Sequence, residues 1–444
     1  MLITNGKIVT WGDKPEIIEG KALLIKDGLI TRIENGSSLK ETHPGEEILD
    51  AGGQLVMAGN ICAHTHFYGA FSRGMAIPGA PPADFQAILS SLWWKLDKAL
   101  DEEGVRYSAL VCLVDAIKYG TTTLFDHHAS PNCIDGSLDI IAEAVRQSGL
   151  RASLCYEVTD RDGEERANAG IRENARFIDK VASGAETPLL RAHFGLHASL
   201  TVSARTLERC LEANTRKAGF HVHAAEGAVD QDDSRRKYGQ RVIERFYEQG
   251  VLGERSILAH CVHADARELD LLAETQAWLS HQPRSNMNNA VGVAPVLEML
   301  RRGVKVVLGN DGFSNAMWEE WKAAYFIQKD HGHDPRLMNG YEVMKIAVEN
   351  NSRLATQTFD GLRVGIIEPG AAADLILVDY HPITPLTGGN LPWHILFGFR
   401  EGMVTSTIVG GKLLMRDRKL VFLDEAEIAA KAREAAQRTW KKIQ

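Results

Sequence analysis

The stretch QLVMAGNICAHTH, residues 54–66, ends a short apolar run on two histidines, His64 and His66. Side chains of a strand alternate between its two faces, so residues that are two positions apart point to the same side. Both imidazoles can then reach one ion, as metal-ligating histidines do. A His-x-His pair also occurs by chance as two loop histidines, so the rest of the chain has to decide between these interpretations.

Seven further short apolar runs follow residue 66, and the segments between them, such as 105–119 and 138–148, carry apolar residues at helical spacing. Eight strands that alternate with helices predict an α/β fold, specifically a (β/α)8 barrel of the TIM type. Strands buried on both faces read as continuous apolar runs, as these do. The expected strands are Leu55–Ile61, Thr122–Asp126, Ala152–Tyr156, Leu190–Leu196, Gly219–His223, Ser256–His260, Ala277–His281 and Val304–Asn310.

A metal-capable or proton-carrying side chain stands at the end of every expected strand. The working residues of (β/α)8 barrels come from these carboxyl ends. Sixteen histidines placed at random along 444 residues would not be expected to fall this way, so we interpret the set as one functional site. Single members could still be polar residues that are satisfied at the barrel mouth. The set comprises His64, His66, Asp126, His127, His128, Glu157, His197, His223, His260, His281 and Asp311.

The two ends of the chain share a sequence pattern that differs from that of the middle of the chain. The first fifty residues alternate apolar and polar residues around turn signals, and the pair Asp27-Gly28 between two such runs predicts a hairpin. The same alternating pattern is found again at residues 374–379 and 406–413. We therefore predict a small β-sandwich domain made from residues 1–54 and 363–444, around a barrel at residues 55–362. A terminal helix over about Leu423–Lys442 is expected to close the chain.

Composition narrows the class of partner. The net charge of -8 and the pI near 6.1, without a basic stripe, argue against nucleic acid, so we expect a small-molecule partner. The first residues do not resemble a signal peptide, and no apolar run approaches the ~20 residues that span a bilayer. We therefore expect no membrane partner and a cytoplasmic location. Six cysteines without paired spacing are expected to be reduced and mostly buried.

The segment 67–100 has no clear periodicity and carries Tyr68, Arg73, several prolines and glycines, and the pair Trp93-Trp94. A long irregular segment in a compact enzyme is usually a lid or a specificity element, and aromatic side chains suit a flat ring. Alternatively, Trp93 and Trp94 pack a surface helix onto the barrel or onto a second subunit.

Three histidines and one carboxylate, His64, His66, His223 and Asp311, would bind a borderline cation such as Zn2+ and leave room for a water molecule. The water loses its proton near neutral pH. Glu226, three residues past His223, can then take up that proton, and His260 from the next strand can hydrogen-bond the same water. Spacing distinguishes only loosely between His223 and His221 as the ligand, because both lie on one face.

Five motifs in this order resemble those of the amidohydrolase superfamily, in the branch of cytosine deaminase, guanine deaminase and the chlorohydrolases. They are AHTH at 63–66, HVHAAE at 221–226, AHCVH at 259–263, SHQPRSN at 280–286 and GNDG at 309–312. The resemblance extends over essentially the full chain, including the return to the β-domain at PGAAADL, 369–375. Residues 67–74, 92–103 and 126–131 are similar to the SsnA-type aminohydrolases in particular.

The resemblance implies one divalent metal, Zn2+ or alternatively Fe2+, held by His64, His66, His223 and Asp311. It also implies a proton-shuttling Glu226 and a water-orienting His260. Relatives with two metals bridge them with a lysine after the fourth strand, and residues 193–200 contain none, which favours one metal. Relatives are commonly dimers or larger, so we expect a homo-oligomer. The sequence Ala198-Ser199-Leu200 departs from the pattern of purine deaminases, which puts substrate contacts borrowed from those enzymes in doubt.

We therefore predict hydrolytic deamination of an aminated nitrogen heterocycle by a metal-bound hydroxide, with Glu226, His260 and Asp311 as catalytic residues. Chloride displacement from a chlorinated triazine or opening of a cyclic amide remains open, because the same site would serve each reaction. A non-catalytic binding protein would show damage to the ligand set, and the sequence shows none. The residues expected to contact the substrate are Arg73, His127, His197, His281 and Asn286.

Overall fold

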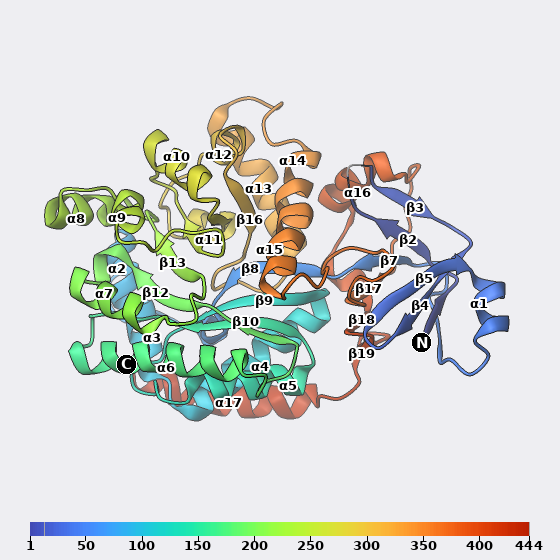
Figure 1. Cartoon of the computed structure of the whole chain (residues 1–444), viewed down its shortest axis with the longest axis horizontal. Coiled ribbons are helices and arrows are strands. Elements are labelled where there is room, and N and C mark those ends of the chain that lie inside the picture. The colour runs from blue at the N-terminus through green and yellow to red at the C-terminus, as the bar shows by residue number, and fades with distance from the viewer. Residues whose placement is uncertain (13, 444) are drawn as a thin grey trace.

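The computed structural model describes residues 1–12 and 14–443, and it contains a large α/β body and a smaller β-rich body (Figure 1). The α/β body is built on strands that pair only in parallel, in the orders β11-β10-β9-β8 and β12-β13-β14-β15-β16. Single bridges, Thr65 to Asp311 and Val158 to Leu196, join the two sheets at both sides. This is the predicted (β/α)8 barrel.

The barrel strands follow the predicted series, with their carboxyl ends at one mouth. The expected fourth strand is divided at His193, and its halves pair with different neighbours, β10 and β13. The strands are β8 (Asn60–Thr65), β9 (Thr121–His128), β10 (Arg151–Tyr156), β11 (Leu190–Ala192), β12 (Phe194–Ala198), β13 (Phe220–Ala224), β14 (Ile257–His260), β15 (Trp278–His281) and β16 (Lys305–Leu308).

The helices between these strands form for local reasons. In α5 (Ser137–Ser148), Leu138, Ile141, Ala142 and Val145 are buried at helical spacing, and Gly149 ends the helix with a φ of 73°. The other helices that surround the barrel are α4 (Glu102–Tyr119), α6 (Glu164–Ala182), α7 (Ala204–Ala213), α8 (Ala228–Tyr238), α9 (Val242–Glu248), α10 (Ala266–Thr275), α11 (Pro283–Asn288), α12 (Val296–Arg301), α13 (Met317–Gly332), α14 (Gly340–Met344) and α15 (Asn351–Thr358).

The expected first strand, Leu55–Ile61, serves two sheets. Its first part, β7 (Leu55–Ala58), pairs with strands of the β-rich body, and only β8 enters the barrel. The chain changes sheet at Gly59, where a Cβ atom would lie 2.2 Å from the side chain of Thr122. The predicted boundary between residues 54 and 55 therefore precedes the point at which the chain enters the barrel by one strand.

The β-rich body contains strands from both ends of the chain, as predicted. Its sheets have the orders β5-β4-β1-β6 and β20-β19-β18-β17-β7-β2-β3. The turn between β4 and β5 is the predicted hairpin, with Asp27 and Gly28 both at positive φ. The strands not yet given are β1 (Leu2–Thr4), β2 (Lys7–Thr10), β3 (Glu16–Ile18), β4 (Lys21–Lys26), β5 (Leu29–Asn35), β6 (Ile48–Asp50), β17 (Leu375–Val378), β18 (Val404–Val409), β19 (Lys412–Arg416) and β20 (Lys419–Leu420).

The predicted terminal helix is α17 (Glu425–Lys441), and it leaves the β-rich body. Figure 1 shows α17 running along the barrel beside α4. Trp440 donates its indole N–H to the carbonyl of Phe71 at 2.8 Å, and Lys442 donates to the carbonyl of Ala99 at 3.0 Å. The helix therefore packs against the segment 67–100.

That segment is only partly the irregular loop that the sequence predicts. It contains η1 (Phe67–Ser72), α2 (Phe85–Ile88), the π-helical turn η2 (Leu89–Trp93) and α3 (Trp94–Ala99), whereas residues 73–84 form neither helix nor strand. Helical pieces this short cannot develop a clear hydrophobic period, so the sequence pattern did not reveal them. Among the residues that the structure describes, no helix is both long and apolar enough to cross a membrane.

Candidate active site

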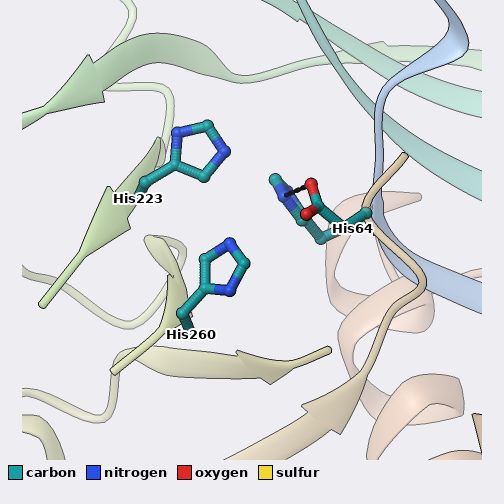
Figure 2. Close-up of side chains that lie close together, drawn as sticks. His64, His223 and His260 are labelled. Carbon is teal, nitrogen blue, oxygen red and sulfur yellow. Dashed lines mark ion pairs between the residues drawn. The ribbon is translucent and has the colours of Figure 1, made fainter. Parts of the chain in front are cut away.

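Four side chains meet at the carboxyl ends of the barrel strands. The Nε2 atom of His66 lies 3.1 Å from Nε2 of His223 and 2.9 Å from Oδ1 of Asp311. His64 Nε2 lies 3.4 Å from the same carboxylate oxygen. Figure 2 shows His223 and His260 pointing from neighbouring strands toward His64. The structure thus brings together the four residues predicted as metal ligands.

Backbone hydrogen bonds around Asp311 join the end of β8 to the residues that follow β16, where the two parallel sheets of the barrel meet. The N–H groups of Asn310 and Asp311 both donate to the carbonyl of His64 at 3.0 Å, and His66 N–H donates back to the carbonyl of Asp311 at 3.0 Å. Asp311 takes a positive φ of 59°, and its carboxylate accepts a short hydrogen bond from Ser285. The backbone of Asp311 is therefore held by the end of β8, and its carboxylate by Ser285 of α11.

Each of the three histidines uses its Nδ1 atom for a hydrogen bond. His64 Nδ1 lies 2.9 Å from His221 Nε2, His66 Nδ1 lies 2.5 Å from the carbonyl of His127, and His223 Nδ1 lies 2.9 Å from the carbonyl of His197. Donation of an Nδ1 proton leaves Nε2 with its lone pair, and all three Nε2 atoms face the common centre. The arrangement also identifies His221 as a partner of His64 in the layer below.

The electrostatics of the four residues fit a cation. Burial lowers the pKa of His64 to about 4 and, with the neighbouring histidines, holds the pKa of His223 well below its usual value. Burial also acts to lower the pKa of His66, but Asp311 and Glu157 outweigh it and raise that pKa well above the usual value.

Burial would raise the pKa of Asp311, but His64 and His66 hold it well below the usual range. A positive charge is therefore favoured beside this carboxylate. The Nε2 atom of His64 has no hydrogen-bond partner among the described residues. Three imidazole nitrogens and one carboxylate oxygen are a donor set that can hold a divalent metal ion in place of a proton.

Two further groups face the centre from the next strands. Oε2 of Glu226 lies 3.4 Å from Nε2 of His260, and Asn289 donates to Oε1 of Glu226 at 3.3 Å. Burial raises the pKa of Glu226 to about 7. His260 Nδ1 donates to Oδ1 of Asn286 at 2.8 Å, so its Nε2 atom is directed at the centre. A carboxyl group with a pKa near neutrality can both accept and return a proton.

A cavity opens on this centre. One wall is apolar and is formed by the helices of segment 67–100, including Trp93 and Trp94. This placement supports the interpretation of the segment as a specificity element. The lining residues are His66, Tyr68, Phe85, Leu89, Trp93, Trp94, Asp97, Glu157, His197, Ala198, Leu200, His223, Glu226, Asp230, Asn289 and Asp311.

The residues predicted to contact substrate are placed differently from one another. His197 lines the cavity. Arg73 does not line the cavity. Its half-exposed side chain forms an ion pair with Asp115 at 2.6 Å instead. His127 donates from Nε2 to the carbonyl of His221 below the centre, and buried His281 has no hydrogen-bond partner for its ring among the described residues. Asn286 contacts His260, as described above, rather than the cavity.

Two cavity residues, Asp97 and Glu157, were not assigned a role from the sequence. Glu157 directly follows β10, as a barrel-mouth residue should. Asp97 follows Trp93 by four residues and Trp94 by three. Within a helix, this spacing places Asp97 on the same face as the two tryptophans. That spacing is the signal that could have found it.

Comparisons with known proteins agree with this architecture. The model of the "Amidohydrolase family" matches residues 55–414. A 5-methylthioadenosine/S-adenosylhomocysteine deaminase of Syntrophomonas wolfei is 30% identical over 444 residues, which cover 99% of each chain.

Two solved structures share the fold. A zinc-bound adenosine deaminase from Xanthomonas campestris has a TM-score of 0.84 at 23% identity and covers 99% of this chain and 98% of its own. The atrazine chlorohydrolase TrzN from Arthrobacter aurescens, complexed with zinc, has a TM-score of 0.81 at 18% identity and covers 98% and 99%. With the family match over most of the barrel and the full-length relative, this chain belongs to the amidohydrolase family of hydrolases.

Proposed function

We propose that this protein is a metal-dependent aminohydrolase that removes an amino group from a nitrogen heterocycle and releases ammonia. The proposed ligands of one divalent metal, zinc rather than iron, are His64, His66, His223 and Asp311. The observation that carries the proposal is the convergence of three histidine Nε2 atoms and one Asp311 oxygen beside Glu226 at the wall of a cavity. Similarity to a relative named as a deaminase of adenosine derivatives supports this reaction.

A divalent cation held by these residues lowers the pKa of a water molecule and so supplies a nucleophile at neutral pH. Glu226 accepts the proton that the water loses, because its carboxylate lies beside the centre and its pKa is raised to about 7. The protonated Glu226 then delivers this proton to a ring nitrogen. Glu226 afterwards accepts the second proton, from the hydroxyl group that has been added to the ring carbon, and passes it to the amine, which departs as ammonia. Its hydrogen bond from Asn289 keeps one oxygen in place during both transfers.

His260 and Asp311 complete the proposed catalytic set. The Nε2 atom of His260 lies 3.4 Å from Glu226, so both side chains can reach one water molecule. His260 keeps its Nδ1 proton on Asn286, which leaves Nε2 free to accept a hydrogen bond from the attacking water. Asp311 is held as a carboxylate and stabilises positive charge at the centre.

The aromatic wall fits the proposed substrate class. Tyr68, Trp93 and Trp94 line the cavity, and the Tyr68 and Trp93 rings lie 6.4 Å apart at an interplanar angle of 87°. The aromatic side chains that border the cavity suit packing against a planar heterocycle.

The test combines metal analysis with an ammonia-release screen over aminated pyrimidines, purines, adenosine derivatives, pterins and triazines. We expect about one zinc per chain and ammonia from at least one ring. Release of chloride from chlorinated triazines, without ammonia from any ring, would show that the protein is a chlorohydrolase. Ring opening of cyclic amides without ammonia release would show that it is a cyclic-amide hydrolase. A purified protein that binds no divalent metal would overturn the proposal.

A further inference from the structure

A second cavity lies at the opposite end of the barrel from the proposed metal centre, and we call it the lower cavity. Its volume is about 440 Å3, a size typical of small-molecule sites. Arg216 and Gly219 lead into β13, Arg255 precedes β14, and Leu190 begins β11, so the lower cavity is at the amino ends of the strands. Among the described residues, none lines both this cavity and the active-site cavity.

Three guanidinium groups line the lower cavity. The exposed side chain of Arg255 has no carboxylate partner in the part of the chain that the structure describes. Arg216 pairs through Nε with Asp179 at 2.7 Å, which leaves its two terminal nitrogens without a carboxylate. Arg191 pairs at 2.9 Å with Asp360, whose side chain is 80% exposed. An anion that enters the cavity therefore finds guanidinium N–H donors that the fold does not use.

The carboxylates of the lower cavity do not neutralise these groups. Two acidic residues, Glu186 and Asp360, line it. Glu186 is already paired with Arg146 at 2.6 Å and with Lys180 at 2.7 Å, and neither of these cations lines the cavity. Only Asp360 is left to balance three arginines, in a chain whose net charge is -8. A local excess of positive charge in a hollow attracts anions, although the molecule as a whole repels them.

The remaining wall suits the body of an organic molecule. Val181, Leu190 and Leu354 supply apolar surface. The Oε1 atom of Gln357 accepts the indole N–H of Trp278 at 2.8 Å, so the amide N–H groups of Gln357 remain as donors. Apolar lining with a few convergent polar groups is the usual composition of a small-molecule site.

We propose that the lower cavity binds a small organic anion, whose carboxylate or phosphate group contacts Arg216 and Arg255 and whose apolar body packs against Leu190 and Leu354. Guanidinium groups bind such oxyanions through paired, charge-assisted hydrogen bonds. The segments that carry the two arginines pack directly together, because a Cβ atom at Gly219 would overlap the carbonyl group of Arg255. The site goes beyond the proposed function and does not depend on it.

The first experiment is calorimetric titration of the unmodified protein with phenyl phosphate, phthalate, inorganic phosphate and neutral benzyl alcohol. We expect about one phenyl phosphate or phthalate to bind per chain, at least about tenfold more tightly than inorganic phosphate, because only the aromatic anions also bury apolar surface. Benzyl alcohol should show no measurable binding. The phenyl phosphate and phthalate arms distinguish a phosphate from a carboxylate as the preferred group. Absence of binding by both aromatic anions would overturn the proposal.

The second experiment locates the bound anion. Arg216→Gln and Arg255→Gln should each weaken binding at least about tenfold, and Arg255→Lys should weaken it less, because lysine keeps the charge but not the planar pair of donors. Arg301→Gln is the matched control, because Arg301 lies outside the lower cavity with a side chain that is 68% exposed. Unchanged affinity in both glutamine variants of the cavity would place the anion elsewhere, for example on the metal centre, and would overturn the proposal.

Asp360→Asn tests the same electrostatics in the opposite direction. The substitution removes the carboxylate that competes for Arg191, so binding of the anion should become at least about twofold tighter. Asparagine also tolerates the positive φ of 56° at this position, and damage to the fold would not strengthen binding. Weaker binding in Asp360→Asn would overturn the proposal. None of these measurements uses ammonia release, so failure of the proposed deamination would leave the outcome unaffected.

Discussion

Nδ1 of His64 lies 2.9 Å from Nε2 of His221, which places a histidine from β13 directly beneath a proposed metal ligand from β8. Both side chains are buried, and Cys155 Sγ lies 3.8 Å from the other ring nitrogen of His221. The contact favours one tautomer of His64, because the Nδ1–H group donates to Nε2 of His221 and Nε2 of His64 then carries no proton.

Replacement of His221 by phenylalanine should therefore weaken metal retention by about 10–100-fold, since the partner that orients a ligating histidine is commonly worth that much. The measurement is a competition titration of zinc against a chromophoric chelator. His281→Phe is the matched control, because His281 is equally buried at the end of β15 and touches none of the four proposed ligands through a hydrogen bond. Equal zinc affinity in the two variants would contradict the role of His221.

Glu226→Gln should retain metal while losing about 10^2–10^4 in turnover, the usual contribution of general acid–base catalysis. Glutamine keeps the size of the side chain and its contact with Asn289 but cannot carry the proton. Metal content and the rate of ammonia release are measured on the same preparation. Near-full activity with full metal would remove Glu226 from the mechanism.

Acid should destabilise the protein through its buried neutral histidines. Burial lowers the pKa of His193 to about 4, and Ser153 lies 2.7 Å from its Nδ1 atom. Because the pKa of His193 is lower in the folded protein, the unfolded chain takes up the proton at a higher pH than the folded protein does. The contribution of His193 to the free energy of unfolding is therefore fully present above pH 6.5 and is lost as the pH falls toward 4. A shift of that size is worth at most about 3 kcal/mol.

The melting temperature of the unmodified protein should therefore fall between pH 7 and pH 4.5. His193→Gln, which cannot titrate there, should show a smaller fall over the same interval. Parallel curves for the two proteins would show that His193 does not contribute.

The change of sheet at Gly59 should tolerate no side chain. A Cβ atom there would lie 2.2 Å from Thr122, so Gly59→Ala should cost about 1–3 kcal/mol of stability, as overpacked sites do. Urea unfolding checks this, with Gly45→Ala as the control, because a Cβ atom at Gly45 meets nothing within 4 Å. Equal midpoints for the two variants would contradict close packing at the change of sheet.

The barrel and the convergence of its strand ends were predictable because both depend on local pattern. Short apolar runs indicate strands that are buried on both faces, and a polar residue directly after such a strand lies at the mouth of the barrel. The four side chains proposed as metal ligands could be chosen in this way, and the structure brings them within hydrogen-bond distance or close to it.

Features that depend on packing between distant segments were not predictable from pattern. Leu55–Ile61 is read as one run, and only the pairing of β7 and β8 with different neighbours shows that it enters two sheets. Arg73 was placed at the substrate from its neighbours in sequence, whereas its partner Asp115 lies 42 residues away. Asp97 faces the cavity because segment 67–100 folds into short helices, which have no long period to detect.

The contacts of α17 with Phe71 and Ala99 imply an order of assembly during synthesis. The segment that walls the cavity leaves the ribosome more than 300 residues before the helix that holds both of its ends. Until α17 has emerged and docked, the strands of the nascent barrel can align, but the segment that walls the cavity lacks the contacts of Phe71 and Ala99 with the C-terminal helix. Recognition of the substrate is thus completed later in biogenesis than the cluster of histidines itself.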